Sequence, residues 1–232
     1  MKNNRLTFVN GLLLCAMFLG STVLRFSAGV TGVQAGQLDR DAIMSTAKSL
    51  SDFSWVVPAT AINAPCLGPP KYSGVPYRSD FDPGSTEIGM PYDWGGMDTI
   101  QSFQEKMRSK KYAAGSHKEH ECKACIGHCT AGIDCSGFVS SCWRLDRHYG
   151  TIEIGRFGAA LPRGFNIFAD LKRGDALVKP GEHIVLFDQQ APNGDPVVYE
   201  AVGRPISRVM HRTHKWADFE GYSPLRYTGV ID

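Results

Sequence analysis

The chain has 232 residues, of which 43% are hydrophobic and 21% charged, as in ordinary globular proteins. Its formal net charge of +2 is too small to indicate binding to nucleic acid or to an anionic membrane surface. The 25 glycines and 13 prolines indicate many turns, so the composition favours a loop-rich α+β domain.

The N-terminal residues have the three parts of a secretory signal peptide. Lys2 and Arg5 form a positive start, residues 6–24 are mostly apolar, and Val33-Gln34-Ala35 fits a small-x-small cleavage pattern. We therefore expect residues 1–35 to be a signal peptide, and the mature protein to be secreted or to lie in the periplasm or cell envelope. No stable membrane span remains after such a cleavage, and about 195 residues are left, enough for one domain.

The next segment combines one helix with a long stretch of turn-forming residues. Residues 38–53 place apolar side chains at helical spacing on one face, which predicts a short amphipathic helix. Residues 54–90 are rich in proline and glycine, which predicts an extended or looping stretch without regular elements. We therefore expect residues 36–88 to form an irregular N-terminal segment that packs on a domain over residues 89–232.

Two helices are predicted in the middle of the chain, on either side of an unusual insert. Asp98 is placed to cap a helix over residues 99–109, with Gln101 in the position of a capping box. A second helix is expected over residues 135–149, where apolar side chains again recur at helical spacing. Between the two helices, at about residues 110–130, lies an insert that is rich in cysteine and histidine.

The C-terminal part of the chain switches to short strands. They are predicted at Asp175–Val178, His183–Phe187, Val197–Val202, Ile206–His211 and Leu225–Thr228. Because the connections between neighbouring strands are short, the strands must be antiparallel. Helices followed by a meander of strands predict an α+β fold in which helices pack on one face of a small antiparallel sheet.

Cys135 is the residue around which a chemical function can be built. Asp134 is a good N-cap type, so Cys135 falls in the first turn of its helix. There the unpaired N–H groups and the positive end of the helix dipole favour a thiolate, which is the nucleophilic form of cysteine. Most cysteines are nevertheless structural, and in a secreted chain a disulfide is the default, so a catalytic role needs support from other residues.

His183 and Glu200 supply the partners that a nucleophilic cysteine needs, namely a base and a group that orients the base. His183 opens an apolar strand, and Glu200 lies in the next strand. If the hairpin closes symmetrically about residues 191 and 192, the two residues pair directly and project to the same face. A shift of one residue would move Glu200 to the other face. A histidine at a strand edge is more often structural, whereas a carboxylate in a half-buried strand needs a partner.

Four elements of the chain, taken together and in order, resemble the motifs of the NlpC-type cell-wall cysteine peptidases. They are Pro91-Tyr92-Asp93-Trp94-Gly95-Gly96, Asp134-Cys135-Ser136-Gly137-Phe138-Val139, Leu171-Lys172-Arg173-Gly174-Asp175 with Gly181-Glu182-His183-Ile184-Val185, and Pro224-Leu225-Arg226-Tyr227. The resemblance implies a papain-like fold and hydrolysis of peptide or isopeptide bonds in peptidoglycan stem peptides, of the γ-D-glutamyl-diamino acid endopeptidase type.

The resemblance also implies roles for individual residues. Cys135 matches the nucleophile and His183 the base, while Glu200 stands where the family usually has His, Asn or Gln. A carboxylate orients imidazole well and raises its basicity, so a Cys-His-Glu triad is chemically reasonable. Tyr92 matches a tyrosine that helps to shape the oxyanion site, with the backbone N–H of Cys135 as the second donor.

Three further positions that match the motifs are expected to line the substrate pocket: Asp134, Ser136 and Trp94. The two glycines that follow Trp94 suggest a tight turn or a close approach of the backbone. The insert before Asp134 is far longer than in compact family members, and we recognise no cell-wall-binding module. Peptidoglycan as the substrate therefore follows from the family resemblance and from no targeting feature.

The insert leaves a metal site and disulfides open as alternatives. A tetrahedral zinc site could be formed by His120, Cys122, Cys125 and Cys129, although a second cysteine pair is missing. Disulfides are the default in an exported protein, so we expect no metal. With Cys15 in the leader and Cys135 set aside, five cysteines remain, so one thiol is unpaired. We expect Cys142 to be this buried thiol and Cys66 to tie the proline-rich segment to the insert.

Three functions remain open at this point. The first is a secreted cysteine hydrolase that acts on peptidoglycan stem peptides as a monomer and needs no cofactor. The second is a papain-like amidase or an acyl or γ-glutamyl transferase on another substrate. The third is a non-catalytic secreted binding domain with a cysteine-rich loop. The presence of Cys135, His183 and Glu200 together argues against the third, because a degenerate site would have lost at least one of them.

Overall fold

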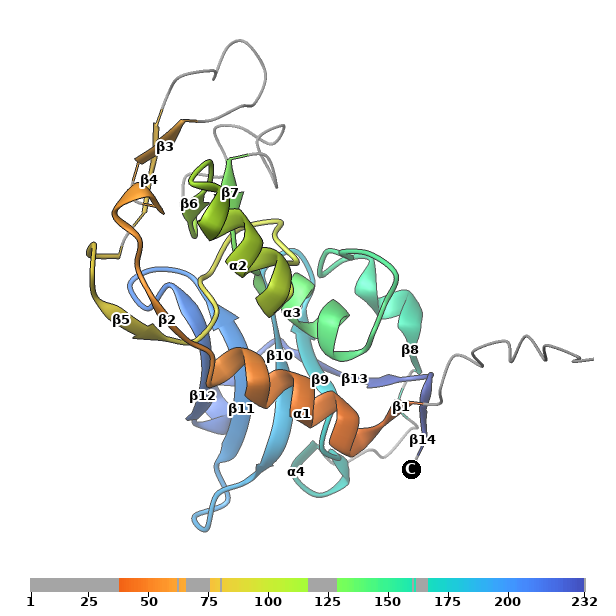
Figure 1. The fold of residues 1–232 in the computed structure, drawn as a ribbon. Coiled ribbons are helices and arrows are strands. Elements are labelled where there is room, and N and C mark those ends of the chain that lie inside the picture. Colours follow the sequence, from red (N-terminus) through yellow and green to blue (C-terminus); the bar gives the residue numbers. More distant parts are fainter. Residues whose placement is uncertain are drawn as a thin grey trace, which may run out of the picture. The chain divides into compact units, whose positions relative to one another are not determined.

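The structure, a computed structural model, describes residues 38–61, 63–65, 76–79, 81–116, 129–159, 161 and 167–231. Within them, helices combine with a six-stranded antiparallel sheet (Figure 1). The predicted α+β class is therefore confirmed. The predicted signal peptide, residues 1–35, lies outside the described residues.

The six strands of the main sheet lie in the order β12-β11-β10-β9-β13-β8, and every neighbouring pair is antiparallel. They are β8 (Gly158–Ala159), β9 (Ala176–Lys179), β10 (His183–Gln190), β11 (Pro196–Val202), β12 (Arg208–Thr213) and β13 (Ser223–Tyr227). All five strands that the sequence predicts near the C-terminus are present. The sequence does not reveal β8, which has only two residues and depends on its partner β13.

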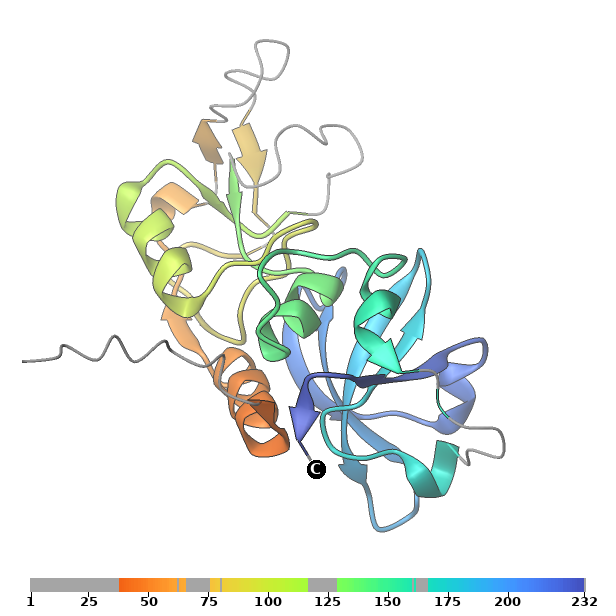
Figure 2. The same cartoon turned by 90° about the vertical axis from the view of Figure 1, so that its right-hand side faces the viewer.

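Two helices pack against one face of this sheet. α1 (Arg40–Ser51) contacts α3 (Cys135–Cys142), β11 and β12, and α3 contacts β10 and β11. Figure 1 shows α1 crossing the strands in front of the sheet, and Figure 2 shows α1 and α3 from the side. The predicted arrangement, with helices on one face of a small sheet, is therefore confirmed.

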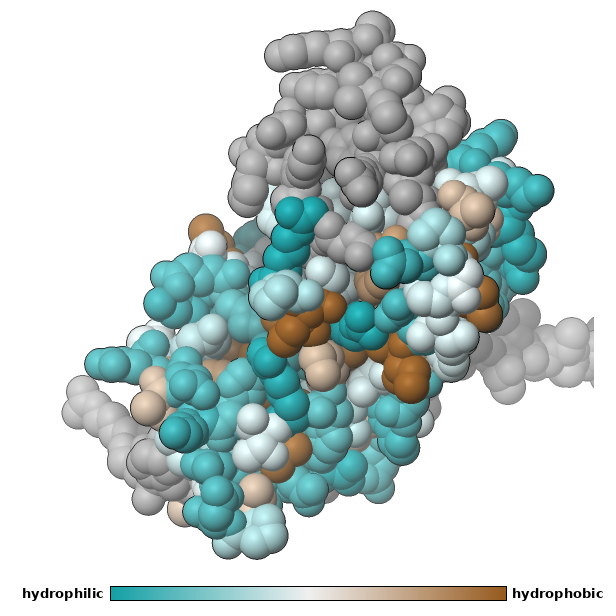
Figure 3. Space-filling view, turned by 90° about the vertical axis from the view of Figure 1, so that its left-hand side faces the viewer, coloured by the Kyte–Doolittle hydropathy of each residue, from teal (hydrophilic) through white to brown (hydrophobic). Residues whose placement is uncertain are grey.

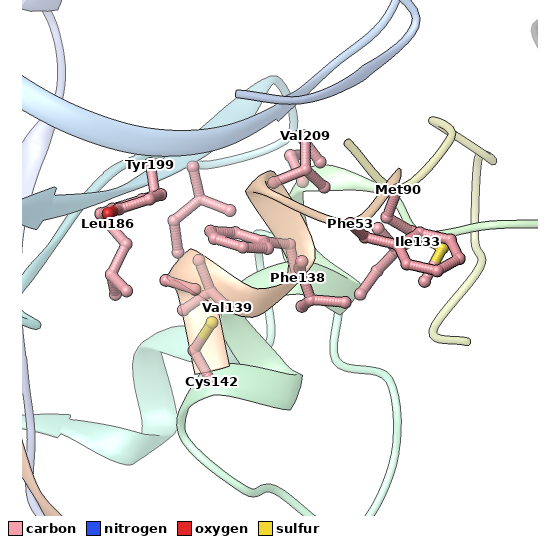
Figure 4. Close-up of a cluster of buried hydrophobic side chains, with 14 of the residues drawn as sticks. Phe53, Met90, Ile133, Phe138, Val139, Cys142, Leu186, Tyr199 and Val209 are labelled. Carbon is pink, nitrogen blue, oxygen red and sulfur yellow. The ribbon is translucent and has the colours of Figure 1, made fainter. Parts of the chain in front are cut away.

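The main core lies between these two helices and the sheet. Figure 4 labels nine of its side chains, which come from several elements. They are Phe53, Met90, Ile133, Phe138, Val139, Cys142, Leu186, Tyr199 and Val209. Because neighbouring side chains of a strand point to opposite faces, the central strands also bury a second set on the other face. That smaller cluster contains Leu171, Leu177, Val185, Phe187, Val198 and Phe219. Burial on both faces explains why these strands read as continuous apolar runs.

The stretch over residues 54–90 is more regular than its sequence predicts. β2 (Ser54–Val56) pairs with β5 (Thr86–Ile88), and β3 (Asn63–Pro65) pairs with β4 (Pro76–Arg78), both antiparallel. The prediction that no regular element occurs here is therefore wrong. The strands are only three residues long and pair with partners that are distant in the sequence, so local proline and glycine content hides them.

The remaining elements are short, apart from one further helix. They are β1 (Leu38–Asp39), the 3-10 helix Ala59–Ala61, α2 (Ile100–Ser109), β6 (Ala113–Ala114), β7 (Thr130–Ala131), the 3-10 helix Ile154–Phe157, α4 (Ile167–Asp170), the 3-10 helix Trp216–Phe219 and β14 (Val230–Ile231). β1 and β14 pair in parallel, as do β6 and β7. The pair of β6 and β7 therefore joins the two ends of the insert.

Two helix boundaries differ from the prediction. Thr99, and not Asp98, caps α2, and its capping-box partner is Ser102, and not Gln101. Asp98 is instead bound at 2.8 Å by Lys106 in a part-buried ion pair. α3 ends at residue 142 and not near residue 149, because Arg144 adopts a left-handed conformation with φ of 52°, which ends a helix.

Asp175 joins two of the motifs on which the family resemblance depends. It is 1% exposed, and Nη2 of Arg226 lies 2.6 Å from its Oδ2. Arg40 reaches the other carboxylate oxygen at 3.0 Å. Beside this ion pair, Trp143 donates to the carbonyl of Gly174 at 3.1 Å. The Gly-Asp motif is therefore fixed both to β13 and to the residue that follows α3.

Figure 3 shows the face on which β2 and β5 lie, where hydrophobic atoms form small separate patches among hydrophilic ones. Val56 and Ile88 of these two strands are 61% and 60% exposed. In the part of the chain that the structure describes, no helix has the length and apolar character needed to cross a membrane.

Candidate active site

The start of α3 is fixed by a carboxylate. Oδ1 of Asp134 accepts a hydrogen bond from the Gly137 amide at 2.6 Å, which satisfies one of the unpaired N–H groups of the first turn. Its Oδ2 accepts from the Gly95 amide at 2.8 Å. The predicted cap is confirmed, and the same side chain holds the helix against the Gly95-Gly96 turn.

Close backbone contacts explain the glycines of this turn. A Cβ on Gly96 would lie 2.6 Å from the carbonyl oxygen of Gly132, and a Cβ on Gly137 would lie 2.1 Å from the carbonyl oxygen of Gly96. Gly95 adopts φ of 74°, a conformation that favours glycine. The close backbone approach that the sequence suggests is therefore confirmed.

We expect Gly137→Ala to lower the free energy of unfolding by about 3 kcal/mol, the upper end of the usual range for overpacked positions. The atom that its Cβ would meet is a backbone oxygen, which cannot turn aside as a flexible side chain can. Gly155→Ala is the matched control, since its Cβ would meet nothing within 4 Å. Unfolding by urea measures both variants, and equal stabilities would contradict the tight contact.

Cys135 occupies the first position of α3 and is only 7% exposed. Burial raises the pKa of its thiol to about 12, the charge of Asp134 adds to the rise, and the amides of Ile184, Ser136 and Cys135 itself oppose it. The amides of the helix terminus therefore favour the thiolate, as expected, but burial outweighs them, so the prediction of a thiolate is not met in the resting protein. A base has to remove the thiol proton before the sulfur can act as a nucleophile.

His183 and Glu200 meet as the sequence predicts, but in a different register. Nε2 of His183 lies 2.8 Å from Oε2 of Glu200. The hairpin closes around Asn193, and a bulge lies between Phe187 and Gln189. If the observed pairing is extended to the start of β10, its register is shifted by two residues from the predicted one. His183 and Glu200 are therefore diagonal neighbours and not direct partners. A shift of two residues keeps both side chains on one face, which is why the contact survives.

Glu200 accepts hydrogen bonds from three side chains. Besides His183, Nε of Arg212 and Nε2 of His214 each lie 2.6 Å from its Oε1. Burial alone would raise the pKa of Glu200, but the hydrogen bonds from His183, His214 and Arg212 hold the pKa of this carboxyl well below its usual value. The sequence analysis missed Arg212 and His214. The signal was present, since both lie at or just beyond the strand that pairs with Glu200's own.

The thiol lies close to this network. The backbone amide of Ile184, the residue after His183, interacts with Sγ of Cys135. Burial raises the pKa of Tyr222, and the charges of Glu200 and Cys135 add to the rise. Among the described residues, no hydrogen bond joins the Cys135 thiol to the His183 ring, whose Nδ1 is not engaged.

A cavity of about 540 Å³ opens at Cys135. Its lining consists of Tyr92, Trp94, Gly95, Cys135, Ser136, His148, Gly150, Thr151, Ile152, Glu153, Gly181 and Glu182. It therefore brings together four residues that the sequence assigns to the site, namely Tyr92, Trp94, Cys135 and Ser136. His183 and Glu200 do not line the cavity, and His148 lines it without having been predicted.

Asp134 has a different place from the one the sequence predicts. It is 5% exposed, does not line the cavity, and its Oδ1 accepts from Ser136 at 3.1 Å and lies 2.9 Å from Nε2 of His148. Its carboxylate thus orients two cavity-lining side chains. Asp134 therefore does not line this cavity, and its oxygens are used within the protein.

Cys129 is disulfide-bonded, with a partner outside the described residues, while Cys135 and Cys142 are free and buried. The predicted unpaired thiol at Cys142 is therefore confirmed. A thiol in a disulfide is not a zinc ligand, so the four-residue zinc site that included Cys129 is wrong as proposed. Its other ligands, and Cys66, lie outside the described residues. Among the described residues, no cluster of His, Cys, Asp and Glu could hold a metal ion.

Fold and site together define an α+β protein with a buried thiol at a helix start and a histidine that is held by a carboxylate. No protein-family model, curated protein or solved structure was found to match the chain.

Proposed function

We propose that this chain is an exported cysteine hydrolase with a papain-like fold that cleaves peptide or isopeptide bonds in peptidoglycan stem peptides. The observation that supports the chemistry is the position of Cys135 at the start of α3, beside the amide of Ile184, the residue that follows His183 of the His183–Glu200 pair. The substrate class rests on the resemblance of four sequence motifs to the NlpC-type peptidases.

In the proposed reaction, His183 acts as the general base. Glu200 binds Nε2 of its ring, which leaves Nδ1 as the atom that takes the proton from the Cys135 thiol. The sulfur then forms a bond to the scissile carbonyl carbon, and the leaving amine takes the proton from His183 as the C–N bond breaks. Water, deprotonated by the same histidine, cleaves the thioester and restores the thiol.

This mechanism accommodates the raised pKa of the thiol. A neutral thiol beside a base can react as the serine of a serine hydrolase does, where the base removes the proton as the nucleophile attacks. The backbone N–H of Cys135, at the start of α3, supplies one donor for the developing oxyanion. Tyr92 lines the same cavity and is the proposed second donor.

We expect Cys135→Ala to lower the rate of stem cleavage by roughly a thousandfold or more, as the loss of a nucleophile does in hydrolases. Peptidoglycan is digested with the mature protein, and the products are identified by mass spectrometry. Cys142→Ala is the matched control, because this second free thiol is fully buried in the core and is not part of the cavity lining. New fragments cut within the stem, present with the control and absent with Cys135→Ala, are the expected result.

Intact stems with the wild-type protein would overturn the peptidoglycan proposal. The burial of Cys135 favours one alternative in that case, a non-catalytic binding domain whose thiol stays protonated. The rate at which iodoacetamide alkylates Cys135 then distinguishes an enzyme with another substrate from a non-catalytic binding domain. A rate that falls sharply in His183→Ala indicates an assisted thiol and another acyl substrate, whereas a rate unaffected by that change indicates the binding domain.

A further inference from the structure

His148 lines the cavity but belongs to none of the motifs. Its Nε2 lies 2.9 Å from Oδ1 of Asp134 and 3.2 Å from Oγ of Ser136, so this end of the ring is held at the start of α3. A Cβ on Gly137 would lie 3.1 Å from Cδ2 of His148, which places the Cδ2 edge of the ring against the helix. The opposite edge, which carries Nδ1, therefore faces away from α3.

Nδ1 is the polar atom of this cluster that remains for a ligand. The oxygens of Asp134 accept from the Gly137 and Gly95 amides and from Ser136, and they contact His148 as well. A carboxylate offers about four lone-pair sites, so these contacts occupy it. Among the described residues, Nδ1 of His148 has no hydrogen-bond partner.

The charges around His148 favour its imidazolium form. Burial lowers the pKa of the ring, but the hydrogen bond to Asp134 and the charge of that carboxylate outweigh it, so the pKa is raised above 6.5. From the loop after α3, Glu153 adds to the rise and Arg147 opposes it, and these two side chains lie 3.6 Å apart. In the imidazolium form, Nδ1 carries a hydrogen and can donate it to an anion.

We propose that His148 forms a carboxylate-binding subsite beside Cys135, so that the substrate carries a carboxylate close to the carbonyl that is attacked. As a statement about the substrate, this rests on the proposed hydrolase function. The two glutamates that line the cavity would repel a carboxylate, but each has a cationic side chain near it, which weakens this repulsion. Of these two glutamates, Glu182 is paired with Lys179 at 2.7 Å, and Glu153 lies 3.6 Å from Arg147.

Two small thiol reagents of the same shape test the subsite without any substrate. Iodoacetate carries a carboxylate where iodoacetamide carries a neutral amide, and both alkylate Cys135 from within the cavity. We expect His148→Gln to lower the ratio of the iodoacetate rate to the iodoacetamide rate by about three- to fivefold, the size of a part-exposed ion pair. Glutamine can still bind Asp134, so the start of α3 stays supported.

Two further variants make the result specific. His148→Lys keeps a positive charge and is expected to restore much of the ratio. His211→Gln removes a histidine that lies on β12, outside the cavity lining, and is expected to leave the ratio as in the wild type. In the wild type, the ratio is expected to fall as the pH rises through the pKa of His148, and this step is expected to be absent from His148→Gln.

An unchanged ratio in His148→Gln would overturn the subsite, whatever the stem digestion shows. If Cys135 reacts with neither reagent, propionate and propionamide replace them, and the shift of the His148 ring in NMR spectra is measured. A shift with propionate alone supports the subsite, and no shift overturns it. A changed ratio together with intact stems would support the subsite and contradict only the peptidoglycan proposal.

Discussion

Glu200→Ala is expected to lower the free energy of unfolding by about 3–5 kcal/mol, the usual cost of removing one partner from a buried charged network. The Glu200 side chain is 2% exposed and binds His183, His214 and Arg212. Without the carboxylate, these three donors lose their common acceptor in a place where water cannot fully replace it. Urea unfolding near neutral pH measures the loss. Stem cleavage is expected to be lost as well, because nothing then orients His183.

The same network predicts a pH dependence. The pKa of Glu200 is lowered in the folded protein, so its contribution to stability is present above the unfolded value near 4.5 and is lost as the pH falls. The hydrogen bond to Glu200 raises the pKa of His214, so that contribution is present below 6.5 and is lost as the pH rises. We therefore expect the network to stabilise the protein most between pH 4.5 and 6.5.

Two variants serve as controls for this result. In Glu200→Gln the amide oxygen can still accept from His183, so cleavage falls less than in Glu200→Ala, while the loss of stability in acid becomes smaller. Glu220→Ala removes an exposed carboxylate and is expected to change stability by no more than about 0.5 kcal/mol. If Glu200→Ala were as stable as Glu220→Ala, the network would not be a stabilising element.

Asp93→Asn is expected to remove a loss of stability that the wild type shows as the pH rises. Asp93 is 1% exposed, and neither carboxyl oxygen forms a hydrogen bond among the described residues. Burial raises its pKa to about 8, and the nearby Thr130 hydroxyl opposes the rise. Between 3.8, the unfolded value, and about 8, the folded protein binds more protons than the unfolded chain. Stability therefore falls as the pH rises through this window.

The loss at pH 8 is expected to be on the order of 3–5 kcal/mol relative to acidic pH. Urea unfolding of the wild type and of Asp93→Asn at several pH values between 5 and 8.5 measures it. Asp82→Asn changes an exposed carboxyl and is expected to keep the wild-type slope. A slope that persists in Asp93→Asn would assign the effect to another group. Since Asp93 lies between Tyr92 and Trp94, its ionisation would also disturb the cavity wall.

Local sequence signals predicted the parts of the fold that neighbouring residues determine. Asp134 is a good capping residue followed by apolar side chains at helical spacing, and α3 begins after it. The strands near the C-terminus also follow from continuous apolar runs that are separated by turns. The cap of α2 was missed because Asp98 had a stronger partner in Lys106, which lies two helical turns away. Such a choice between two acceptors depends on the packed helix and not on the local pattern.

In the candidate site, too, some features follow from the local sequence and others depend on the packed structure. The predicted contact of His183 with Glu200 occurs because a strand alternates its faces, so a register shift of two residues leaves both on one side. The bulge that causes part of this shift leaves no clear mark in the sequence. His148 was missed because only the fold brings the loop after α3 back to the cap of that helix.

The sequence by itself determined the fold class, the strands, the cap at Asp134 and the pairing of a histidine with a carboxylate, because these follow from periodicity and from the local needs of polar groups. Only the tertiary structure decided how Cys135 is solvated and which cations surround Glu200. Helix position alone predicted a thiolate, but burial, which depends on every element packed around the thiol, raises its pKa to about 12.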